Sequence, residues 1–232
     1  MDLRRWADDA FAEAIGRERR HDPVLPVTGG PAGNAKLTAW TGLVLLVLFF
    51  IEGVTLLDLG RLLSWHIVVG VLLVPPALLK TGSTGWRILG YYTGRAPYRR
   101  AGPPPALLRI LGPLVVLSTL ALLGSGLALV ALGPFASRSN LLTILGHGIN
   151  AVIIHKVIFV GWFGVTSLHT LGRLLPAIRI VAAPLRAEPG VPGWRIRGTV
   201  LVFTLLVAAI AATTVLGLSG PWLHGGLHHV VR

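Results

Sequence analysis

Three histidines lie inside long apolar stretches of this 232-residue chain, namely His66, His155 and His169. A polar side chain within a stretch that can cross a bilayer costs free energy, so its presence there indicates a function. A neutral imidazole can bind a metal through one ring nitrogen while the other nitrogen is hydrogen bonded. Metal ligation within a membrane is therefore the first chemistry that these residues suggest.

The positions of the three histidines suit axial ligation of haem iron. His66 and His155 each lie about four residues inside one end of an apolar stretch, which places both about 6–10 Å below the same membrane surface. A haem with two imidazole ligands needs such a pair at one level on facing helices. His169 follows His155 by fourteen residues, so it lies within about 40° of the same helix face and about 21 Å further across the membrane. That spacing fits a helix that serves two stacked haems. The alternative is that His155 makes a packing contact and His169 is an interfacial polar residue.

Three charged residues, Glu52, Arg61 and Lys156, lie near the level of His66 and His155. Glu52 and Lys156 can neutralise each other, since charges within a membrane usually pair. Alternatively, Lys156 or Arg61 binds a haem propionate, while Glu52 orients a ligating imidazole or relays a proton. The sequence leaves both interpretations open.

The composition indicates the elements that must position these side chains. Hydrophobic residues make up 53% of the chain and charged residues 13%, whereas an ordinary soluble domain has about 25% charged residues. The apolar residues form long blocks, each able to supply the roughly 20 residues of a bilayer helix. The predicted fold class is an all-α integral membrane helical bundle, with four helices around the histidines and a fifth, C-terminal span. Pro75-Pro76 predicts a kink near the end of the second span. The predicted spans are residues 38–57, 62–79, 106–133, 148–172 and 198–218.

Basic residues predict the orientation of the spans. Seventeen lysines and arginines precede the first span or lie around the second-to-third and fourth-to-fifth connections, against three on the other side. The positive-inside rule then predicts a multi-pass protein of the cytoplasmic membrane, with its N-terminus cytoplasmic and its C-terminus external. Contact with membrane lipid accounts for the net charge of +12, so no nucleic-acid partner is expected.

The chain divides into three predicted parts. Residues 1–35 hold an interfacial amphipathic helix on the cytoplasmic surface and a tether rich in glycine and proline. Residues 36–175 form the four-helix bundle. Residues 176–232 form a cytoplasmic loop, the fifth span and an external tail. A solvated interfacial segment explains the remaining external histidines without a metal. These are His147, His224, His228 and His229.

Two motifs carry a resemblance to a known family: Trp65-His66-x-x-x-Gly70 in the second span and His155-x13-His169 in the fourth. With these motifs, residues 36–175 resemble the cytochrome b subunits of membrane-bound formate dehydrogenases and nickel–iron hydrogenases. The resemblance implies a four-helix fold with b-type haem, a quinone and a partner oxidoreductase subunit. It also implies that His66 and His155 are the axial ligands of an outer haem.

The family also holds an inner haem, for which the resemblance implies His169 and a histidine at the start of the first span. This chain has Ala39 where that second ligand would stand. A scheme with two histidines on each of two helices fails as well, because Lys80 lies fourteen residues after His66. His21 in the tether is another candidate partner for His169. One haem b is therefore expected, in the outer leaflet, and the second is left open.

The predicted function is electron transfer between the quinone pool and a partner redox protein, as a subunit of an oxidoreductase complex rather than a complete enzyme. The chain has no cysteine, which excludes disulfides, iron–sulfur clusters with thiolate ligands and covalent c-type haem. The segment Tyr91–Tyr98 can dock a partner or a quinone headgroup, although interfacial anchoring explains it too. The alternative function is a non-haem membrane anchor or a small-solute carrier, whose histidines pack or relay protons.

Overall fold

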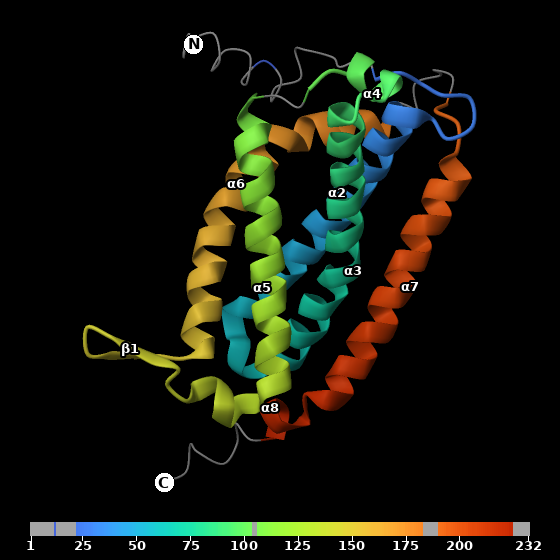
Figure 1. Cartoon of the computed structure of the whole chain (residues 1–232). Helices are drawn as coiled ribbons and strands as arrows, with labels where there is room; N and C mark the ends of the chain where they lie inside the picture. Colours follow the sequence, from blue (N-terminus) through green and yellow to red (C-terminus); the bar gives the residue numbers. More distant parts are fainter. Residues whose placement is uncertain (1–11, 13–21, 104–105, 183–189, 225–232) are drawn as a thin grey trace.

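The computed structural model describes residue 12 and residues 22–103, 106–182 and 190–224. Helices dominate this part of the chain (Figure 1). The long ones are α2 (Gly30–Thr55), α3 (Leu59–Tyr92), α5 (Ala106–Arg138), α6 (Ala151–Ala182) and α7 (Trp194–Leu218). The short elements are η1 (Leu56–Asp58), α4 (Ala96–Arg100), β1 (Leu142–Ile144), β2 (His147–Ile149) and α8 (Gly220–His224).

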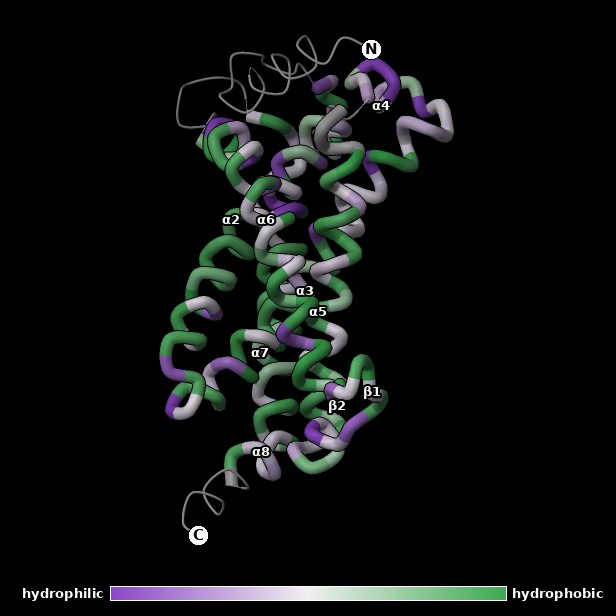
Figure 2. Tube along the Cα trace, turned by 90° about the vertical axis from the view of Figure 1, so that its left-hand side faces the viewer, coloured by the Kyte–Doolittle hydropathy of each residue, from purple (hydrophilic) through white to green (hydrophobic). Residues whose placement is uncertain are grey.

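Four helical stretches of the described chain are long and apolar enough to cross a membrane. The first is a stretch of 63 residues that contains α2, η1 and α3. A straight helix of that length would measure about 95 Å, but the chain turns at η1 and α3 packs back along α2. Hydrophobic residues run along the middle of the helices, and hydrophilic residues gather towards the two ends (Figure 2). The chain is a multi-pass membrane protein whose apolar helices contact lipid.

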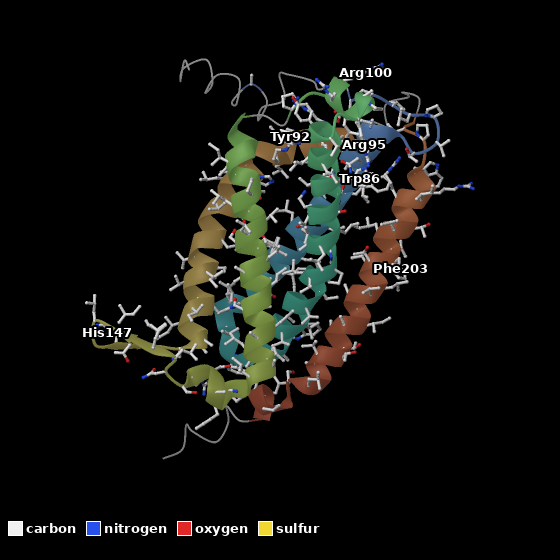
Figure 3. All side chains as sticks on the ribbon, in the orientation of Figure 1. Trp86, Tyr92, Arg95, Arg100, His147 and Phe203 are labelled. Atoms are coloured by element: carbon white, nitrogen blue, oxygen red, sulfur yellow. The ribbon has the colours of Figure 1, made fainter. Side chains whose placement is uncertain are left out.

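Large apolar side chains on the outside of the bundle agree with this placement. Phe50 of α2 is 73% exposed, Val160 of α6 is 70% exposed and Phe203 of α7 is 66% exposed. Figure 3 shows Phe203 pointing away from the other helices. Exposure of such a large apolar surface to water would cost free energy, whereas contact with the hydrocarbon of a bilayer does not.

Four helices surround the bundle axis, and α7 lies outside them. Helix α2 packs against α3 and α6, and α5 packs against α6 and α3. Helices α3 and α6 therefore occupy opposite corners of the four-helix bundle. Helix α7 packs mainly along α3. We call the end of the bundle at which α4 lies the α4 end. We call the opposite end, at which β1, β2 and α8 lie, the hairpin end (Figure 1).

An apolar middle layer fills the bundle between its two ends. Leu73 of α3 is 2% exposed and packs with Leu45 and Phe49 of α2. The ring of Trp162 in α6 packs at a tilt against the ring of Phe49, with 4.7 Å between the ring centroids. Its Nε1 donates a hydrogen bond of 2.9 Å to Thr119 Oγ1 of α5. Trp162 lies seven residues after His155 and seven before His169, so the three side chains share one face of α6.

The second predicted span, residues 62–79, is shorter than the helix that contains it. Helix α3 passes through Pro75 and Pro76 and continues to Tyr92. Each proline removes one helical hydrogen bond, and in a bundle the neighbouring helices can compensate for this loss. The prolines therefore do not end the helix, and the bundle extends further towards the α4 end than the sequence predicts.

The structure is mostly helical, as predicted, with one short hairpin of two strands that the sequence did not predict. Strands β1 and β2 form an antiparallel hairpin in which Ile144 pairs with His147. Leu145 and Gly146 make the two-residue turn, with φ values of 50° and 80°. Such turns usually have asparagine or aspartate before glycine. Because leucine stands at that position here, the sequence did not indicate a hairpin. The predicted amphipathic helix, within residues 1–35, lies outside the described residues apart from Ala12. The end of the predicted tether belongs to α2, which begins at Gly30.

Candidate functional site

His66 and His155 lie near the hairpin end of the bundle, on the two helices that occupy opposite corners. His66 belongs to the second turn of α3, and His155 to the second turn of α6. Both side chains are half-buried, and the two imidazoles are close enough to interact electrostatically. The structure thus brings together the two residues that the sequence matched by depth.

Helix α2 fixes the imidazole of His66. Its Nδ1 lies 2.9 Å from Glu52 Oε1 and 3.0 Å from Thr55 Oγ1. The Thr55 hydroxyl donates its own hydrogen to the carbonyl oxygen of Glu52 at 2.6 Å. A carboxylate can only accept, and this hydroxyl has no second hydrogen to give, so Nδ1 carries the ring proton and donates it. The lone pair of His66 therefore lies on Nε2.

Helix α5 fixes the imidazole of His155 in the same way. Its Nδ1 lies 2.8 Å from Ser125 Oγ, and the Ser125 hydroxyl donates to the carbonyl oxygen of Leu122 at 2.9 Å. When the Ser125 hydroxyl donates to Leu122, its oxygen accepts from Nδ1, and the lone pair of His155 lies on Nε2. These contacts allow both histidines the tautomer that ligates a metal through Nε2 while a second group holds Nδ1.

Thr55 and Ser125 are site residues that sequence reasoning missed. Thr55 is 11 residues from His66 and Ser125 is 30 residues from His155. No local spacing links either pair, because the contacts depend on how α2 meets α3 and how α5 meets α6. A polar residue within an apolar span was the one available signal.

Glycines allow close packing around both imidazoles. A Cβ atom at Gly126 of α5 would lie 3.4 Å from Cε1 of His155, and one at Gly70 of α3 would lie 3.4 Å from Glu52 Oε1. Both distances are at the tight limit of ordinary contact. Small residues at these two positions therefore let the helices hold the polar side chains inside the bundle.

The charged residues predicted beside the histidines have different positions. Glu52 contacts His66, so it does not form the pair with Lys156 that the sequence allowed. Lys156 is exposed on α6. The side chain of Arg61 is 89% exposed and lies 3.6 Å from Asp58. A role for Lys156 or Arg61 with haem propionates stays a prediction.

His169 belongs to a separate group nearer the α4 end. Its Nδ1 is buried and has no hydrogen-bond partner among the described residues. It interacts electrostatically with Lys80 and Arg173. Ala39, which stands where the family has its second inner ligand, is buried. Among the residues that the structure describes, His169 is the one histidine at this end. His21 lies outside that part, as do His228 and His229 at the C-terminal end. His147 is exposed on the hairpin (Figure 3).

Two imidazoles can supply two ligands to a metal. The described residues contain no group of three or more histidine, cysteine, aspartate or glutamate side chains that could hold a metal ion. His66 and His155 could bind a metal whose remaining ligands come from elsewhere, as in a haem iron held by four porphyrin nitrogens. No family model, no curated protein and no solved structure matches this chain.

Proposed function

We propose that the chain is a b-type haem subunit that transfers electrons across part of the membrane, between the quinone pool and a partner redox protein. One observation carries the proposal: His66 of α3 and His155 of α6 lie close enough to interact electrostatically, and each has its Nδ1 within hydrogen-bond distance of a neighbouring helix. With the Nδ1 protons directed at Glu52, Thr55 and Ser125, both Nε2 atoms keep a lone pair for iron.

A bound haem would supply the one-electron couple of ferric and ferrous iron, and the side chains of the chain would set its environment. Glu52 accepts the Nδ1 proton of His66 and increases the basicity of the ligating nitrogen. Ser125 holds the ring plane of His155. The apolar middle layer, with Leu73 and Trp162 at its centre, keeps water out of the bundle below the site.

The placement in the membrane follows from charge. The proposal has five spans, α2, α3, α5, α6 and α7, with the α4 end on the cytoplasmic side. Figure 3 shows Trp86, Tyr92, Arg95 and Arg100 at that end, and the Arg95 guanidinium lies 4.3 Å from the centroid of the Trp86 ring. An excess of arginine and lysine is typical of the cytoplasmic side, and aromatic side chains are typical of both interfaces. His66 and His155 would then lie in the outer leaflet of the cytoplasmic membrane.

One haem is proposed for this chain. A second haem on His169 would need another axial ligand, and the structure brings no second imidazole to it among the described residues. The partner protein is proposed only by chemical class, as an oxidoreductase subunit that exchanges electrons with the haem. A quinone is proposed as the other redox partner.

Removal of the axial ligands tests the proposal. His66→Ala and His155→Ala should each abolish most of the bound haem, to a similar extent, because the two residues hold one iron from opposite faces. Absorption spectra of the purified variants, oxidised and reduced with dithionite, measure this loss. His147→Ala on the exposed hairpin is the matched control, and His169→Ala should also retain the low-spin spectrum. Full low-spin haem in His66→Ala would refute the assignment of that ligand.

A further inference from the structure

The β1–β2 hairpin extends sideways from the bundle at the start of α6 (Figure 1). It connects the end of α5 at Arg138 to the start of α6 at Ala151. From residue 139 to residue 155 the sequence has no aspartate, glutamate, lysine or arginine. An isolated hairpin of two strands is only marginally stable in water. An uncharged hairpin that projects from the bundle therefore favours contact with a second surface.

The strand register divides the hairpin into two faces. Residues that pair directly across two antiparallel strands lie on the same face, and the faces alternate along each strand. One face, which we call the apolar face, has three apolar side chains and one imidazole. They belong to Leu142 and its partner Ile149, and to Ile144 and its partner His147. Leu142 is 46% exposed and Ile144 is 55% exposed, so the described part of the chain leaves this face largely uncovered.

The opposite face is small and polar. It consists of Thr143 and its partner Gly148. The side chain of Asn140 lies so close to Gly148 that a Cβ atom would not fit there. Leu145 and Gly146 form the turn and belong to neither face. The hairpin is therefore amphipathic, as an interfacial helix is.

The backbone of the hairpin excludes a position in the hydrocarbon core. Each of the two strands pairs along one edge only. The outer edges therefore present N–H and C=O groups that have no partner within the sheet, and hydrocarbon cannot bond to them. Water and lipid headgroups can, so the headgroup layer is the depth that suits this hairpin.

Lys156 indicates where the headgroup layer meets the neighbouring helix. It lies five residues after Ala151 and is exposed, about 7.5 Å along α6. Val157 and Val160, which are 66% and 70% exposed, belong to the surface of α6 that contacts lipid. A lysine on such a surface extends its ammonium group to the headgroups. The headgroups therefore lie near the first turns of α6, at the level where the hairpin begins.

We propose that the apolar face lies on the bilayer surface beside α6. Its three apolar side chains contact the boundary between headgroups and acyl chains, and the opposite face is directed at water. Only Asn150 separates β2 from α6, so the apolar face continues the surface of that helix that contacts lipid. His147 suits this place because an imidazole has an apolar body and a polar edge. The contact does not depend on bound haem.

Spin labels on single cysteines test the proposal, because the chain has no cysteine of its own. Ile144→Cys places the label on the apolar face, and Thr143→Cys is the matched control on the opposite face. Both full-length variants are reconstituted in vesicles of phosphatidylcholine and phosphatidylglycerol. Power saturation then measures collisions of each label with molecular oxygen, which concentrates in lipid, and with a neutral nickel chelate, which stays in water. The label at position 144 should collide with the chelate several-fold less often than the label at position 143, and more often with oxygen.

Two results would overturn the proposal. One is equal access of the chelate to the two labels, or lower access at position 143. The other is protection of position 144 from both reagents, because a protein surface would then cover the apolar face. If Ile144→Cys does not fold, Leu142→Cys on the same face takes its place and should give the same result. The measurement does not involve haem, so its failure is distinguishable from failure of the proposed function.

Discussion

At the scale of single residues, the decisive feature is the position of one proton on each imidazole. His66 and His155 both carry it on Nδ1 when the hydroxyls of Thr55 and Ser125 donate their hydrogens to the backbone carbonyls of Glu52 and Leu122. In the opposite tautomer Nε2 would carry the proton and could not ligate iron. The tautomers are therefore what makes this pair suitable for an axial role.

The carboxylate of Glu52 should tune the haem potential. Glu52→Gln keeps an acceptor for the Nδ1 proton of His66 but removes the negative charge beside it. Loss of that charge destabilises ferric iron relative to ferrous iron, so the reduction potential should rise. A spectroelectrochemical titration of the purified variant measures the change.

Asp58→Asn is the matched control for this substitution. Asp58 is the other acid near the hairpin end in the described chain, and it pairs with Arg61. Asparagine at this position can still cap α3. Its potential should equal that of the parent chain. An unchanged or lower potential in Glu52→Gln, at full haem content, would contradict the proposed role of Glu52.

At the scale of helices, the closeness of α5 to α6 holds His155 in place. Gly126 leaves no room for a large side chain against the imidazole. Gly126→Leu should therefore displace His155 and remove most of the bound haem, as measured by the ratio of Soret absorbance to protein. Gly124→Leu, on the same helix and with open space around its Cα, should retain haem. Equal haem contents in the two variants would contradict this account.

The helices were more predictable than their contacts. Long apolar blocks are enough to indicate bilayer helices, because hydrocarbon requires every backbone group to bond within its own segment. The positions of His66 and His155 near one end of the bundle were predictable from the same blocks. The hydrogen bonds that orient them were not, since Ser125 meets His155 only after α5 and α6 have packed. The turn at Leu145 was also hidden, because leucine rarely adopts a positive φ.

At the scale of the whole molecule, two polar levels are separated by an apolar middle layer. The level at the hairpin end holds His66 and His155, and the level at the α4 end holds Lys80 and His169. At each level, one residue belongs to α3 and the other to α6. Lys80 follows His66 by fourteen positions, and His169 follows His155 by fourteen positions. The bundle thus repeats one geometric arrangement with different chemistry: two imidazoles at one level and a cationic group at the other.

The orientation of the bundle can be measured because the chain has no cysteine of its own. Leu145→Cys at the exposed tip of the hairpin should react with a membrane-impermeant maleimide in intact cells. Arg100→Cys in α4 should react only after the cells are permeabilised, since the proposed orientation places that end in the cytoplasm. The reverse pattern would place His66 and His155 in the inner leaflet. Both positions are exposed in the structure, so burial does not limit labelling.

The most direct measurement of the central claim is a pyridine haemochrome assay on the purified full-length chain, expressed with an adequate supply of haem. The account predicts about one haem b per chain, bound by His66 and His155 without a covalent link. Because the chain contains no cysteine, acid–acetone should extract this haem completely. Protein that is folded, as judged by size-exclusion chromatography, and that carries no haem above trace would contradict the account.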